Sequence, residues 1–222
     1  RMVKAKFDVR AMLRACANGS SELMSNISSS LISVIYNLQL LRFAGENGVA
    51  AYGTIMYVQF IFIAMFIGYT IGTAPVIGYH YGAGNHMELR NLLKKSFTVV
   101  SIAGVLMTAA AWGLAGPLSG VFVGYDMELY ELTKHAFRMF AFSFLLAGVN
   151  IFASSFFTAL NNGGVSAAIS FLRTLVFQVA SVLVLPVFLG LDGIWYSITV
   201  AEVLAFFVSL LFLIANRRKY HY

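Results

Sequence analysis

The stretch from Gly68 to Asn85 reads GYTIGTAPVIGYHYGAGN and combines five glycines with one proline at the end of an apolar segment. It closes a long apolar run that begins near Ala50, and a loop with basic residues at positions 90, 94 and 95 follows it. Pro75 has no backbone N–H group to donate, and glycines allow a close approach of backbones. The stretch therefore predicts a membrane helix that bends or unwinds near one membrane face.

Gly68 and Gly72 are four residues apart, which is the small-xxx-small spacing of closely packed membrane helices. Together with Pro75 and Gly78 they are the candidate hinge or packing residues of this helix. The pattern alone leaves two interpretations open, because the glycines serve either packing only or a more specific function.

The composition places the chain in a membrane. It has 222 residues, of which 59% are hydrophobic and only 11% are charged, whereas soluble domains carry about 25% charged residues. The formal net charge is +6, but the basic residues lie at the ends of apolar runs, as topogenic charges do. We therefore expect a lipid bilayer, and not nucleic acid, as the surroundings of this chain.

The apolar pattern predicts an all-α integral membrane bundle of six transmembrane helices, because each run is near or above the roughly 20 residues that cross a bilayer. The predicted spans are 20–43, 50–79, 96–114, 132–160, 165–189 and 194–215. Gly- and Asn-rich turns separate them, with a break expected at Gly116–Pro117 and a short interfacial piece at 120–126. Residues 1–17 read as a basic amphipathic linker, 18–216 as the transmembrane lobe, and 217–222 as a basic tail.

The loop charges predict the orientation of the bundle. With six spans, the basic N-terminal stretch, the loop at 90–95 and the tail at 217–219 share one side, whereas most acidic loop residues lie on the other. By the positive-inside rule, both termini are expected in the cytoplasm.

Two ionisable residues are expected deep inside the bilayer. Arg173 lies eight residues into the fifth span and Glu202 eight residues into the sixth, so each is about 12 Å deep at 1.5 Å per residue. The two spans are antiparallel neighbours, and we expect the side chains to pair or to share a polar pocket. The pair serves either to lock two helices together or to exchange a proton or cation at Glu202.

Polar residues of the first span form a second candidate site. They recur at near-helical spacing, so the stripe either lines a water-filled cavity or packs helices, and the acid and the two amides favour the cavity. Further candidates for a substrate or ion pathway lie in three other spans. The candidates in the first span are Glu22, Asn26, Ser29, Tyr36 and Asn37. The candidates in the other spans are Gln59, Asn150 and Gln178.

Motifs for covalent chemistry are missing from the sequence, which has no phosphate-binding loop, HExxH motif or nucleophile elbow. Cys16 is the only cysteine, so an internal disulfide is impossible. We therefore expect no enzyme activity, no cofactor and no resident metal.

Three segments resemble the multidrug and toxic compound extrusion (MATE) transporters. They read GYHYGAGN at 78–85, FFTALNNG at 156–163 and LGLDGIW at 189–195. The resemblance runs over nearly the whole chain but matches only the C-terminal half of such a transporter. Some members bind a cation through acids in the first and fourth spans of this half, but the fourth span here reads AGVNI at 147–151, without an acid.

The resemblance implies a multi-pass antiporter of the plasma or bacterial inner membrane. It would export amphipathic, cationic drugs or metabolites in exchange for protons or sodium, and its partner would be an N-terminal lobe outside this chain. One alternative is a lipid-linked saccharide flippase of the same superfamily, which requires a basic cavity. The others are a membrane scaffold subunit that transports nothing and a homodimer of two such halves.

Overall fold

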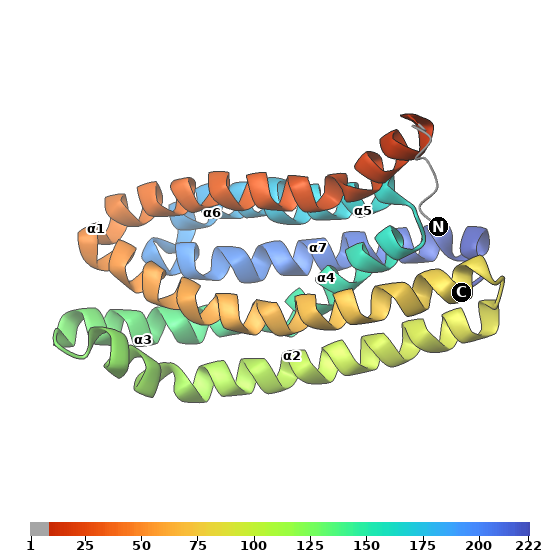
Figure 1. Cartoon of the computed structure of the whole chain (residues 1–222). Helices are drawn as coiled ribbons and strands as arrows, with labels where there is room; N and C mark the ends of the chain where they lie inside the picture. Colours follow the sequence, from red (N-terminus) through yellow and green to blue (C-terminus); the bar gives the residue numbers. More distant parts are fainter. Residues whose placement is uncertain (1–8) are drawn as a thin grey trace, which may run out of the picture.

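The computed structural model describes residues 9–222, and these residues form an all-helical bundle (Figure 1). Residues 1–8 of the predicted linker lie outside the described part, and residues 9–17 continue directly into the first helix. The elements are α1 (Val9–Gly82), α2 (His86–Val123), α3 (Met127–Ala141), α4 (Phe144–Ala159), α5 (Gly163–Phe171), the π-helix η1 (Leu172–Phe177), α6 (Gln178–Leu189) and α7 (Leu191–Tyr220).

Helix α1 consists of two antiparallel arms that meet at Gly45 (Figure 1). Gly45 has φ 61° and ψ −149°, a backbone conformation that is essentially restricted to glycine. We call residues 9–44 the first arm and residues 46–82 the second arm. They correspond to the first two predicted spans, and the turn predicted between these spans lies where the chain reverses.

Six passes follow from this arrangement. Four helical segments are each long and apolar enough to cross a membrane: α1, α2, the continuous segment from α5 through η1 to α6, and α7. Helices α3 and α4 together pass the same test as a pair bent by 48°. Because α1 supplies two arms, the described residues cross the bundle six times, as predicted. The start of α1 and the end of α7 lie at the same end of the bundle, which we call the termini end (Figure 1).

Side-chain caps define where three of the helices begin. Asn85 accepts a hydrogen bond from the backbone N–H of Glu88 at the start of α2, and Asn162 accepts one from Val165 at the start of α5. Asp126 accepts two, from Glu128 and Leu129, at the start of α3. These short polar side chains satisfy N–H groups that have no partner within the helix, so the sequence itself sets the boundaries.

Three expected irregularities differ in the structure. Helix α2 continues through Pro117 to Val123, so the predictions of a break at Gly116–Pro117 and of a separate piece at 120–126 are wrong. Helix α1 likewise continues through Pro75 without unwinding, because Gly45 is its only residue with non-helical dihedral angles. The fourth span, expected as one helix, is divided between Ala141 and Phe144. Membrane helices tolerate proline when neighbouring groups satisfy the freed carbonyls, so the residue type alone did not locate the breaks.

The core consists of two apolar clusters. One lies around Tyr36, Phe140, Phe144 and Trp195. The other lies nearer the termini end, around Phe152, Phe156, Phe157, Tyr220 and Tyr222. Large apolar side chains also cover much of the outside, and Phe188, for example, is 78% exposed. A surface of this kind is suited to hydrocarbon rather than water.

Candidate functional site

Arg173 and Glu202 form a buried ion pair between η1 and α7. Arg173 Nη2 lies 2.7 Å from Glu202 Oε1, and Arg173 Nε lies 3.0 Å from both carboxylate oxygens. The side chains are only 15% and 4% exposed. The pairing predicted from the depths of the two residues is therefore confirmed. Bidentate contacts of this kind between a guanidinium and a carboxylate fix the orientation of both groups as well as their distance.

Asn150 on α4 is the third member of this site. Its Nδ2 donates to Glu202 Oε2 at 2.7 Å and to the backbone oxygen of Glu202 at 2.9 Å. The residue is completely buried, and its Oδ1 has no hydrogen-bond partner among the described residues. The carboxylate is thus held from two sides by donors of two other helices, while one amide oxygen inside the protein remains able to accept a hydrogen bond.

The backbone at Arg173 departs from an ordinary α-helix. Residues Leu172–Phe177 form a π-helix between α5 and α6. π-Helical turns are rare and occur frequently at functional sites, because the wider turn shifts the direction of the side chains that follow. Nothing in the sequence LRTLVF demands this geometry, so sequence reasoning did not predict it.

A chain of hydroxyl groups lies between α4 and α5. Ser154 Oγ is 2.9 Å from Ser166 Oγ and 2.9 Å from Ser170 Oγ, and Thr158 Oγ1 is 2.6 Å from Ser166 Oγ. Sequence reasoning missed these residues. The sequence nevertheless contains a signal, a regular spacing of four residues between polar side chains. On α4 these are Asn150, Ser154 and Thr158, and on α5 they are Ser166 and Ser170.

Most of the predicted stripe on the first arm lies on an open face of the lobe. Glu22, Asn26 and Ser29 are exposed, and Asn37 is half-buried. Asn26, Ser29 and Asn37 each donate to the backbone carbonyl four residues earlier in their own helix. The stripe therefore contacts no other helix of this lobe through these bonds, and its amide oxygens and the Glu22 carboxylate face outward.

Tyr36 differs from the rest of this group because it belongs to the core. It is 1% exposed, its hydroxyl is hydrogen-bonded to the Ser197 hydroxyl, and its ring stacks on Tyr52 at 5.3 Å between centroids. Tyr36 thus connects the two arms of α1 to α7.

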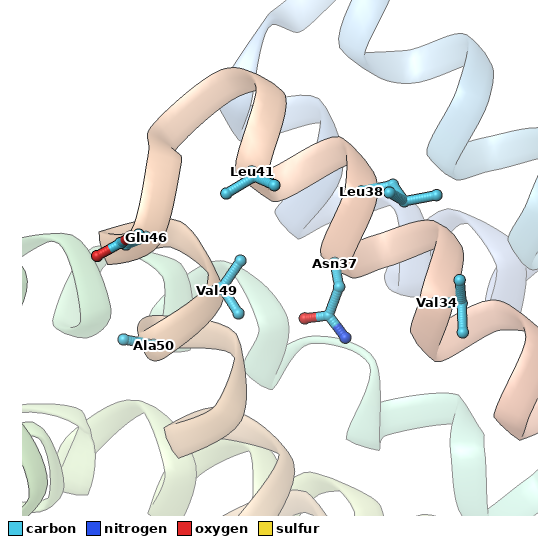
Figure 2. A pocket seen from close by; sticks show the side chains of 7 residues that line it. All are labelled: Val34, Asn37, Leu38, Leu41, Glu46, Val49 and Ala50. Atoms are coloured by element: carbon cyan, nitrogen blue, oxygen red, sulfur yellow. The ribbon is translucent and has the colours of Figure 1, made fainter.

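An open pocket lies between the two arms of α1, close to Gly45 (Figure 2). Its volume is about 540 Å³, which is within the range of small-molecule sites, roughly 300–1,000 Å³. Two polar side chains, Asn37 and Glu46, come from opposite arms, and the rest of the wall is apolar (Figure 2). The apolar lining residues are Val34, Leu38, Leu41, Val49 and Ala50.

The remaining candidates are dispersed. Gln59 on the second arm is half-buried, and its Oε1 is buried without a hydrogen-bond partner among the described residues. Gln178 opens α6 and is half-buried. Neither belongs to the site around Glu202 through any hydrogen bond of the described residues.

The candidate hinge glycines do not pack tightly within this lobe. A Cβ atom added at Gly68 or Gly72 would meet nothing within 4 Å, and at Gly78 it would meet only the Ala159 carbonyl oxygen at 3.6 Å. Pro75 is exposed on the same arm. Close packing at this small-residue face would therefore need a surface other than the helices of this lobe.

No group of three or more His, Cys, Asp or Glu side chains within residues 9–222 is placed to hold a metal ion. The chemically distinctive features of the described chain are therefore the three-residue site at Glu202, the hydroxyl chain beside it and the pocket between the arms.

Comparison with protein families and solved structures gives a consistent result. The MatE family model matches residues 23–184. A probable multidrug resistance protein, YoeA of Bacillus subtilis (strain 168), is 24% identical over 212 residues, covering 89% of this chain and 43% of that protein. The multidrug export protein MepA of Staphylococcus aureus (strain bovine RF122 / ET3-1) is 21% identical over 194 residues, covering 87% and 42%.

Solved structures have the same fold. One is the outward-facing conformation of a multidrug resistance MATE family transporter of the MOP superfamily. It superposes with a TM-score of 0.90 at 21% identity, covering 99% of this chain and 50% of that chain. The chain thus spans about half the length of the curated relatives and of the solved structure that it matches.

Proposed function

The chain belongs to the MatE family, and we propose that it forms the C-terminal lobe of a secondary antiporter. In this proposal the complete protein exports amphipathic, cationic compounds across the cell membrane in exchange for protons or sodium. A second lobe, which this chain does not contain, faces the open side of the first arm and encloses the substrate. Both termini of the chain described above lie in the cytoplasm.

The observation that carries the proposal is the buried carboxylate of Glu202 inside a helix as apolar as α7. An ionisable group at the centre of a bilayer costs about 2.5–3.5 kcal/mol on insertion scales, and such groups are usually paired and functional. Glu202 is 3% exposed and has two partners on two other helices.

The site provides a way to couple ion exchange to helix packing. When the Glu202 carboxylate is ionised, it holds Arg173 of η1 and Asn150 of α4 against α7. Protonation would remove its negative charge and weaken both contacts, because hydrogen bonds between ionised groups are roughly twice as strong as neutral ones. A sodium ion would find hard oxygen ligands in the carboxylate and in the unpaired Asn150 Oδ1. Either ion thus changes what holds the three helices together.

The pocket between the arms supports a cationic, amphipathic substrate. Its wall is mainly aliphatic, Glu46 offers a negative charge, and the amide oxygen of Asn37 can accept a hydrogen bond. Apolar walls with few polar groups are typical of ligand sites. The flippase alternative receives less support, because Arg173 is paired with Glu202 and Arg138 lies over the Trp112 ring at 4.8 Å, so neither offers a free positive charge.

The test is efflux by the complete transporter with Glu202→Gln. The matched control is Glu131→Gln, because Glu131 is an exposed acid on α3 whose partner is Lys134. We expect Glu202→Gln to abolish export of a cationic dye under an imposed proton or sodium gradient, measured per amount of protein in the membrane, and Glu131→Gln to export normally. Undiminished efflux by Glu202→Gln would remove this residue from the mechanism. Failure of the wild type to export under either gradient would favour the scaffold alternative.

A further inference from the structure

We propose that four hydroxyl groups between α4 and α5 conduct protons between Glu202 and the termini end of the bundle. We call Thr158, Ser166, Ser154 and Ser170, in this spatial order, the hydroxyl file. The inference rests on the proposed function, and it specifies the proton as the coupling ion and this file as its route to one side of the membrane.

The distances within the file are those of direct hydrogen bonds. Thr158 Oγ1 to Ser166 Oγ is 2.6 Å, Ser166 Oγ to Ser154 Oγ is 2.9 Å, and Ser154 Oγ to Ser170 Oγ is 2.9 Å. Each hydroxyl can donate one hydrogen and accept others. A continuous series of such groups can therefore pass a proton along by accepting one at one side and releasing its own at the other.

Helix packing alone does not require this arrangement. A hydroxyl inside a membrane helix commonly donates to a carbonyl of its own helix, as Thr174 Oγ1 does to the Ser170 backbone oxygen at 2.7 Å. In the file, Ser154 Oγ and Thr158 Oγ1 also lie 3.1 Å from the Ser166 backbone oxygen and 3.3 Å from the Ser154 backbone oxygen. The hydroxyls of the neighbouring helix are closer to both, at 2.9 Å and 2.6 Å. Ser166 in the middle of the file is 0% exposed, and Ser170 at its inner end is 7% exposed, so these two hydroxyls are shielded from competing solvent.

The inner end of the file faces the level of the Glu202 site. Asn150 is four residues before Ser154 on α4, which is about 6 Å deeper along the helix at 1.5 Å per residue. Its buried Oδ1 has no partner among the described residues, although its Nδ2 donates to Glu202. This oxygen provides an acceptor for one water molecule, and buried waters typically make about three hydrogen bonds to protein groups. The Ser170 hydroxyl and the Glu202 carboxyl would supply the others.

The outer end of the file reaches the termini end. Thr158 lies in the last turn of α4, next to the loop at 160–162, and is half-buried. Asn18 of the first arm donates to its backbone oxygen at 3.1 Å. In the proposed orientation this end is cytoplasmic, so the file serves as the exit of the proton from Glu202 into the cytoplasm.

The transfer balances in protons. The protonated Glu202 carboxyl gives its proton to the bridging water, and the water gives one of its protons to the Ser170 oxygen. Each hydroxyl of the file then accepts one proton and releases its own to the next, and Thr158 releases the last one to solvent water. The net change is one proton less on Glu202 and one more in solvent, and the ionised carboxylate pairs again with Arg173.

The test uses Thr158→Val in the complete transporter, in liposomes that enclose a pH-sensitive dye. Valine has the shape of threonine, so it leaves no space in which a water molecule could replace the lost hydroxyl. We expect substrate-driven proton movement to slow about a hundredfold, the usual order for loss of a positioned proton-transfer group. Thr158→Ser should keep the wild-type rate, because it keeps the hydroxyl. Thr174→Val is the matched control, since it removes a hydroxyl that donates to its own helix and is not a link of the file.

Glu202→Gln in the same assay separates the two proposals. If Glu202→Gln stops proton movement but Thr158→Val moves protons at the wild-type rate, the file is overturned and the proposed function stands. If Glu202→Gln moves protons normally, the file is overturned together with its premise. If only a sodium gradient drives transport, the file is overturned and the proposed function stands with sodium as the coupling ion. Substrate binding by Thr158→Val in detergent should equal that of the wild type.

Discussion

Arg173 and Glu202 are 29 positions apart in the sequence, and the Arg173 Nη2 atom lies 2.7 Å from Glu202 Oε1 inside the bundle. Three contacts shorter than or equal to 3.0 Å join the two side chains. This pair connects η1 to α7, and Asn150 extends it to α4. The same carboxylate therefore holds three helices together and, in the proposed function, exchanges the ion.

Removal of one partner of this pair should destabilise the lobe strongly. Arg173→Met leaves the buried carboxylate without its cation, which typically costs about 3–5 kcal/mol in the free energy of unfolding. Arg173→Lys should lose less of the free energy of unfolding, because lysine keeps the positive charge although it cannot make the bidentate contact. Thermal unfolding of the complete protein in detergent measures both. The double variant Arg173→Met/Glu202→Leu should recover most of the loss, and a double variant as unstable as Arg173→Met would contradict this explanation.

The close approach of α2 to α4 predicts a second destabilising change. A Cβ atom at Gly104 would lie 2.8 Å from the Leu145 backbone oxygen and 3.0 Å from that of Phe144. Backbone cannot move aside as a side chain can, so we expect Gly104→Ala to cost about 1–3 kcal/mol in the free energy of unfolding. Gly113→Ala on the same helix meets nothing within 4 Å and should be neutral or slightly stabilising. Equal melting temperatures for the two variants would refute the predicted clash.

The reversal of α1 depends on glycine at position 45. Its φ of 61° with ψ of −149° lies in a region where other residues are strained by about 1–3 kcal/mol. Gly45→Ala should lower the melting temperature accordingly. Gly53→Ala, in a helical part of the second arm with nothing within 4 Å, serves as the control and should not lower it. A Gly45→Ala variant with the same melting temperature as the wild type would show that a side chain at position 45 does not strain this turn.

Residue patterns were sufficient to predict the six passes and the Arg173–Glu202 pair. Both follow from the lengths of the apolar runs and from the depth of each residue along its helix, which are properties of the local sequence. The start of α2 at Asn85 and that of α5 at Asn162 also follow the residue type, because a short polar side chain accepts the free N–H groups there.

Other features depend on packing that the local sequence does not encode. Pro75 and Pro117 predict irregular helix geometry, yet both are accommodated within continuous helices. The π-helix at Arg173, in contrast, contains no residue type that would predict it. Asn150 is a candidate from its sequence position, but its contact with Glu202 depends on how α4 and α7 are rotated relative to each other, which the local sequence does not encode. The spacing of four shared by Ser154 and Thr158 was readable in the sequence and was missed.

The pocket predicts a charge effect on substrate affinity. Glu46→Gln should weaken binding of a cationic amphipathic dye to the complete protein about two- to fivefold, which is the range expected for an exposed ion pair. Binding of an uncharged analogue should not change. Fluorescence titration measures both, and an equal weakening for the two ligands would indicate that Glu46 acts through the shape of the pocket and not through its charge.

The most direct test of the central claim is to count the ions that substrate binding displaces from the complete protein. The account predicts that the wild type, in weakly buffered detergent solution, releases a proton or sodium ion when a cationic substrate is added. Glu202→Gln should bind the substrate but release none, because its amide neither ionises nor carries the negative charge. Equal release by the wild type and Glu202→Gln would contradict the account and reduce the Arg173–Glu202 pair to a structural connection between helices.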